Sequence, residues 1–72
     1  MRSPSTLRRL LGQADRELDA ATGTRDLLAA RLGEVGRDHL QLTRVATDLA
    51  TAEARLAAAE ARWLELAEEL GA

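Results

Sequence analysis

Apolar residues recur along this chain at alternating spacings of three and four, in two separate series. The first series runs from residue 7 to residue 32, the second from residue 42 to residue 70, and each is longer than three heptads. A repeat of 3.5 residues places such side chains along one stripe of an α-helix, and two stripes of this kind pack together as a left-handed coiled coil. The chain is therefore predicted to be all-α.

The two stripes consist mainly of Leu and Ala. Arg25 interrupts the first stripe, and nothing interrupts the second. Because an unpaired buried charge is costly, we predict that Arg25 lays its stem along the seam and sends its guanidinium to water or to an acid. The side chains expected to pack in the seam are Leu7, Leu11, Leu18, Leu28, Leu42, Leu49, Leu56, Trp63 and Leu66.

A short glycine-containing segment separates the two series. Gly33 suits the left-handed residue that ends a helix, and Gly36 permits a tight reversal. Asp38 suits the N-cap of a second helix, while Ser3 and Pro4 suit the N-cap and first position of the first helix. So short a connection makes the helices antiparallel neighbours. We predict one antiparallel two-helix coiled-coil hairpin, with helix one at residues 4–32, a turn at 33–37 and helix two at 38–70.

Helix one has a weak point where Gly23 stands between two threonines. Glycine in a helix interior is about 1 kcal/mol less favourable than alanine. We therefore expect the first helix to bend or fray near Gly23.

Two registers can pair the predicted helices. In the first register, Leu7 lies opposite Trp63. In the second, shifted by one heptad, Ala14 lies opposite Trp63 and Leu11 lies opposite Leu66. Both give layers of acceptable volume. We favour the first, because it needs only the short turn between the helices.

The composition excludes several classes of protein. The 72 residues include no cysteine, which rules out disulfides and thiolate metal sites and fits a reducing cytoplasm. No apolar run approaches the roughly 20 residues of a membrane helix. There is no glycine-rich phosphate loop, and the single histidine, His39, has no partner for a zinc site. We predict a cytoplasmic, non-catalytic chain that holds no metal or cofactor of its own.

The basic residues are unevenly placed. All ten are Arg, and eight of them lie within the first 44 positions. Arg contacts account for much of the binding of proteins to phosphate backbones, so nucleic acid is a candidate partner. The alternative is an ordinary solvated surface of mixed charge, since several Asp residues share the first helix. The candidate contacts are Arg2, Arg9 and Arg16, spaced seven apart, with Arg37 and Arg44 near the turn.

Trp63 is the only aromatic residue and falls on the second stripe. We interpret it as a packing residue whose indole N–H reaches the rim of the seam. A base-stacking surface would instead need an exposed ring.

The segment GRDHLQLTRVATDLATAEARLAAAEARWLELAEEL, residues 36–70, resembles the C-terminal coiled-coil domain of bacterial ABC-F ATPases, the Uup type in particular. The specific part of the resemblance is roughly residues 52–70, which contain an ExxWxxL pattern like the one that often ends the last helix in that family, here Glu60, Trp63 and Leu66. The resemblance implies a hairpin that follows two ATP-binding cassettes in a cytoplasmic protein acting on ribosomes or linked to DNA. It also implies that ATP and Mg²⁺ belong to the parent protein. The Lys-rich lead-in usual in that family is absent here.

From these observations we expect a nucleic-acid-binding module, for DNA or ribosomal RNA, within an ABC-F ATP-binding protein. The alternative is a protein-interaction or spacer hairpin that forms a homodimer or docks partner helices. A third interpretation is a tRNA-gripping arm of a tRNA synthetase, since such arms are also helical hairpins.

Overall fold

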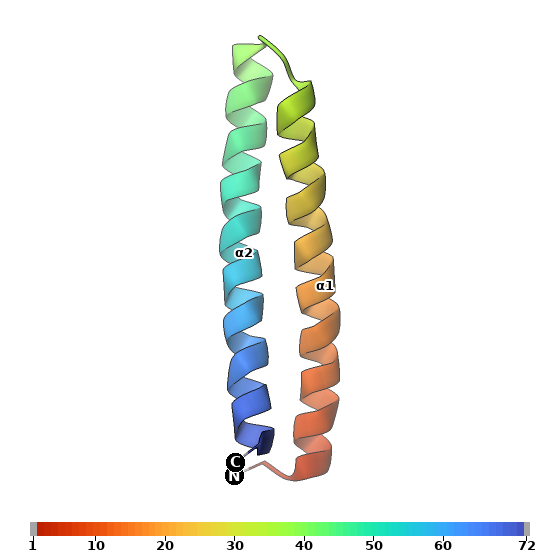
Figure 1. The fold of residues 1–72 in the computed structure, drawn as a ribbon. Helices are drawn as coiled ribbons and strands as arrows, with labels where there is room; N and C mark the ends of the chain where they lie inside the picture. Colours follow the sequence, from red (N-terminus) through yellow and green to blue (C-terminus); the bar gives the residue numbers. More distant parts are fainter. Residues whose placement is uncertain (1, 72) are drawn as a thin grey trace.

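The computed structural model describes residues 2–71 as two long helices joined by a short turn. Helix α1 spans Pro4–Glu34, helix α2 spans His39–Gly71, and the described residues contain no strand. Figure 1 shows the helices side by side and antiparallel, with the start of α1 and the end of α2 together opposite the turn. The hairpin measures 53 × 14 × 13 Å. The predicted all-α hairpin is therefore confirmed.

Both helices begin at the predicted capping residues. The Ser3 hydroxyl accepts a hydrogen bond from the backbone N–H of Thr6 at 3.3 Å, and Pro4 follows in the first turn. A carboxylate oxygen of Asp38 accepts from the backbone N–H groups of Leu40 and Gln41, at 3.1 and 3.2 Å. These side chains satisfy donors that a helix start leaves without a partner, which fixes where each helix begins.

The end of α1 differs from the prediction. The helix continues through Gly33 to Glu34, and Gly36 has the positive φ, 68°, that the reversal needs. Gly33 is therefore helical, and its predicted left-handed conformation is wrong. Continuing the helix keeps Leu32 and the half-buried Val35 in line with the seam, which outweighs the low helix propensity of one glycine.

The expected fraying at Gly23 is also wrong. Helix α1 passes through this residue without a break. The neighbouring Thr22 hydroxyl donates to the Leu18 carbonyl oxygen at 2.9 Å, so the threonine bonds within its own helix.

The core follows the two predicted stripes. All six hydrophobic residues that are buried in the described part of the chain belong to them, and most other stripe residues are half-buried. Arg25 is half-buried too, and its Nε donates to an Asp26 carboxylate oxygen at 2.7 Å, as the sequence predicted. Leu42 is the exception, because 37% of it is exposed beside the turn. The buried residues are Leu7, Ala14, Val45, Ala52, Leu56 and Leu66.

The contacts between the helices correct the favoured register. The Trp63 indole N–H donates to a carboxylate oxygen of Asp15, which places Trp63 level with Ala14 and not with Leu7. The buried cluster of Leu7, Ala14 and Leu66 has the same pairing, with Leu11, Trp63 and Leu70 packed against it. These contacts fit the second register. Because α1 runs on to Glu34, the reversal lies later in the chain than the first register required.

Neither helix, within the part of the chain that the structure describes, has an apolar stretch long enough to cross a bilayer.

Candidate nucleic-acid interface

The outer side of α1 carries the most concentrated group of free basic residues. Arg9 and Arg16 are both exposed, and seven helical residues put their Cα atoms about 10.5 Å apart. A terminal guanidinium nitrogen of Arg16 lies 3.8 Å from the position that a Cβ atom would take at Gly12. The Arg16 side chain therefore folds back along α1 toward Arg9, across a position where glycine leaves room.

The first turns of α1 contain no carboxylate on that helix, although Arg16 itself lies between Asp15 and Glu17. No acid occurs before Asp15, whereas Arg8 and Arg9 stand side by side and exposed. Together with Arg16 they form what we call the α1 basic surface: Arg8, Arg9 and Arg16. Arg8 was not among the predicted contacts, although its position in the acid-free first turns was a usable signal.

Arg2 is not available to a phosphate group in the way that Arg9 and Arg16 are. Its guanidinium forms two hydrogen bonds with the Glu69 carboxylate, one from Nε at 3.3 Å and one from a terminal nitrogen at 2.5 Å. The hydrogen bond from Arg2 lowers the pKa of Glu69, and the same bond raises the pKa of Arg2. Arg2, which the sequence predicted to contact phosphate, thus connects the start of the chain to the end of α2.

Arg37 and Arg44 lie at the other end of the hairpin. Both are exposed, Arg37 in the turn and Arg44 in the second turn of α2. Arg44 lines a small hollow of about 170 Å³ with Arg31, Leu28 and other residues. Most of the hairpin's 53 Å length separates this pair from Arg9, so the five predicted arginines do not form one site. Arg31 was missed because its place beside Arg44 depends on the register.

Trp63 belongs to the packing of the hairpin. It is half-buried against the cluster of Leu7, Ala14 and Leu66, and its indole N–H is engaged by Asp15. The interpretation of Trp63 as a seam residue with its N–H at the rim is confirmed. A ring held in this way does not offer two open faces to a base.

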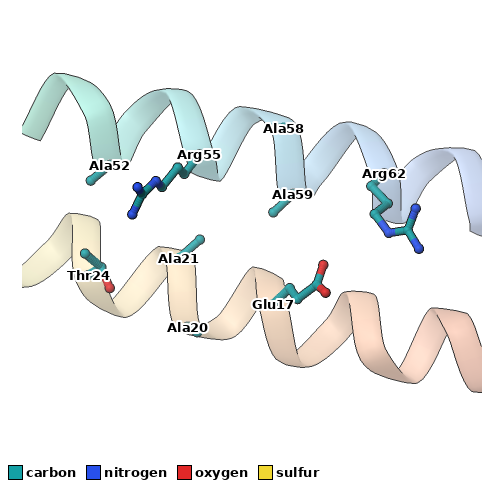
Figure 2. A pocket seen from close by; sticks show the side chains of 9 residues that line it. All are labelled: Glu17, Ala20, Ala21, Thr24, Ala52, Arg55, Ala58, Ala59 and Arg62. Atoms are coloured by element: carbon teal, nitrogen blue, oxygen red, sulfur yellow. The ribbon is translucent and has the colours of Figure 1, made fainter.

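A shallow groove of about 480 Å³ opens near the middle of the hairpin. Figure 2 shows Ala52 and Ala59 pointing toward α1 and Ala21 pointing toward α2, with charged side chains at the edge. Because alanine fills so little space, the helices leave their contact open here. The residues that line the groove are Glu17, Ala20, Ala21, Thr24, Ala52, Arg55, Ala58, Ala59 and Arg62.

The groove has no arrangement that suggests catalysis. Its floor is alanine, and it contains neither a nucleophile beside a base nor a buried acid. Residues 2–71 contain no group of three His, Cys, Asp or Glu side chains that could hold a metal ion. His39 is exposed at the start of α2.

Comparison of the chain with the known protein families, with curated proteins and with solved structures gives no match. The fold defines the class of protein, a two-helix antiparallel hairpin. Its function has to be inferred from the surfaces of the hairpin itself.

Proposed function

We propose that this hairpin is a non-catalytic arm of an ABC-F ATP-binding protein of the Uup type, and that it contacts the phosphate backbone of DNA or ribosomal RNA. The observation that supports the contact is the α1 basic surface. Arg8, Arg9 and Arg16 are exposed, and Arg8 and Arg9 lie in the part of α1 that precedes its first acid, Asp15. Phosphate contacts of this kind act without reading the base sequence.

The family assignment rests on residues 52–70. In the hairpin, Trp63 and Leu66 of the ExxWxxL pattern lie in the seam, while Glu60 is exposed. The pattern therefore reflects the packing of the arm more than a binding surface. Two ATP-binding cassettes preceding this segment in the parent gene are the expected context, and ATP and Mg²⁺ would bind there in a cytoplasmic protein.

The net charge of −2 limits the strength of the contact. We expect weak binding that depends strongly on salt, because the affinity comes from the counterions released by a few arginines. The rest of the parent protein would supply a second point of attachment and raise the effective concentration of the arm.

The test is a titration of labelled duplex DNA and of a ribosomal RNA hairpin with the whole chain at several salt concentrations. The logarithm of the affinity should fall linearly with the logarithm of salt. Changing Arg9→Glu and Arg16→Glu together should weaken binding and reduce the slope by about 2.

The matched control is Arg55→Glu with Arg62→Glu, which changes the net charge equally on another surface. Equal losses in both double variants would show that α1 is not the contact surface. Absence of binding at low salt would remove the proposal altogether.

A further inference from the structure

The groove and the small hollow lie on one side of the hairpin. Thr24 lines the groove and Arg31, seven residues later, lines the hollow; Arg55 and Asp48 have the same relation on α2. Residues seven apart in a coiled coil return to the same side of the helix. We call this side the groove face; its members precede a seam residue in the sequence, as Glu17 precedes Leu18.

In each helix, a residue that directly follows a seam residue in the sequence lies on the side of the hairpin opposite the groove face, because the heptad repeat places it on the other flank of the seam. That side is strongly acidic, with five carboxylates and one arginine, so two copies would repel each other there. These residues are Arg8, Asp15, Asp19, Asp26, Glu53 and Glu60.

The groove face is balanced. It carries opposite charges at matching levels of the two helices: Glu17 with Arg62 beside the groove, and Arg31 with Asp48 beside the hollow. The second register adds Glu34 level with Arg44. The ion pairs between described residues are Arg2–Glu69 and Arg25–Asp26. None of the six charged residues in these three groove-face pairs takes part in either of those ion pairs.

We propose that two copies of this chain pack groove face to groove face, with the hairpins parallel and α1 of each copy over α2 of the other. In this arrangement Glu17 meets the partner's Arg62 and Arg31 meets the partner's Asp48. The alternative, antiparallel arrangement is disfavoured, because it brings Arg55 level with the partner's Arg62. The alanines at the centre, Ala20 and Ala58, allow the helices to approach closely.

The available area suits such a dimer. A face 53 Å long and 14 Å wide lets two copies bury on the order of 1,500 Å² in total, within the range of stable interfaces. Between residues 2 and 71 the free hairpin buries six hydrophobic residues, so covering the alanine floor and Leu27, 71% exposed beside it, would add apolar contact. The α1 basic surface points elsewhere and would stay accessible.

The first test is sedimentation equilibrium of the whole chain up to about 200 μM, a range that detects dissociation constants weaker than micromolar. The expected result is a dimer. Ala58→Glu should weaken dimerisation at least tenfold, because it places a charge in the close contact. Ala57→Glu is the matched control, since this neighbouring exposed alanine lies on the other side, and it should change the constant less than twofold. A monomeric wild type, or equal effects of both variants, would overturn the proposal.

The second test determines orientation and uses the absence of native cysteine. Ala20→Cys and Ala58→Cys chains, mixed and oxidised, should form a disulfide-linked mixed dimer, and neither variant alone should link efficiently. Efficient linking of Ala20→Cys to itself would mean antiparallel hairpins and would overturn the parallel arrangement. Circular dichroism of each variant confirms that the hairpin is still folded.

Discussion

The half of the hairpin near the chain ends is packed more tightly than the half near the turn. Leu7, Ala14 and Leu66 form a buried cluster there, and Leu66 is only 1% exposed. Near the turn, Val45 is buried, with 7% of it exposed, but the seam residue Leu42 is 37% exposed. The same heptad spacing therefore gives two different degrees of burial.

The difference comes from side-chain volume and from where the chain reverses. Leu10, Leu11, Trp63 and Leu70 surround the cluster at the chain ends, so large side chains enclose the small Ala14. In the middle, alanines face one another and leave the groove. Regular spacing sets which side of a helix is apolar, but volume decides how well the space is filled.

Among the variants that test this comparison, Leu66→Ala should have the largest effect on the free energy of unfolding. Loss of a fully buried leucine typically costs about 2–5 kcal/mol, because a cavity remains. Leu28→Ala, at a half-buried seam position near the turn, should cost less, and Leu64→Ala, 53% exposed, should cost least. Urea unfolding followed by circular dichroism measures all three. Equal costs for Leu66→Ala and Leu28→Ala would break the distinction between the two halves.

Gly23→Ala should stabilise α1 by about 1 kcal/mol, because alanine is the better helix former. The added methyl group meets no atom within 4 Å, and Gly23 has no positive φ. Gly36→Ala should act in the opposite direction, since φ is 68° there and alanine is strained in that conformation. The two melting temperatures, compared with the wild type, check both signs. Destabilisation by Gly23→Ala would mean that this glycine has a role the helix does not reveal.

Trp63→Phe should destabilise the chain by about 1 kcal/mol, because it removes the hydrogen bond to Asp15 while keeping an aromatic ring in the seam. Asp15→Asn is the complementary change, and it should alter the fluorescence of the only tryptophan. If the double variant loses as much as the two single variants combined, the two side chains are not coupled and the register assigned from this bond is wrong.

The smallest expected effect concerns Arg2 and Glu69 at the chain ends. The pKa of folded Glu69 lies below its ordinary value of 4.5, because Arg2 donates hydrogen bonds to the carboxylate. The Glu69 carboxylate therefore binds a proton more readily in the unfolded chain than in the folded one. The contribution of the pair is present above pH 4.5 and is lost as pH falls through the lowered pKa. Since both groups are exposed, the contribution is small.

Arg2→Gln should flatten the acid side of the stability curve, measured as melting temperature from pH 6 down to pH 2.5. Arg9→Gln removes an equal charge from an exposed residue of α1 that forms no such pair with any of residues 2–71, and it is the control. An identical change in both variants would show that net charge, and not the pair, controls the acid transition.

The sequence by itself determined the two helices, their caps at Ser3 and Asp38, and the stripes that form the seam. Each of these depends on local rules: a capping side chain acts within three residues, and a 3.5-residue repeat marks one side of a helix. The exposed positions of Arg9 and Arg16 follow from the same repeat.

Only the tertiary structure decided the register, and with it the Trp63–Asp15 bond, the Arg2–Glu69 pair and the groove. A heptad pattern looks the same after a shift of seven residues, so periodicity cannot choose between two pairings of the stripes. The choice depends on where the chain reverses and on how large and small side chains fit across the seam, and both require the two helices to be in contact.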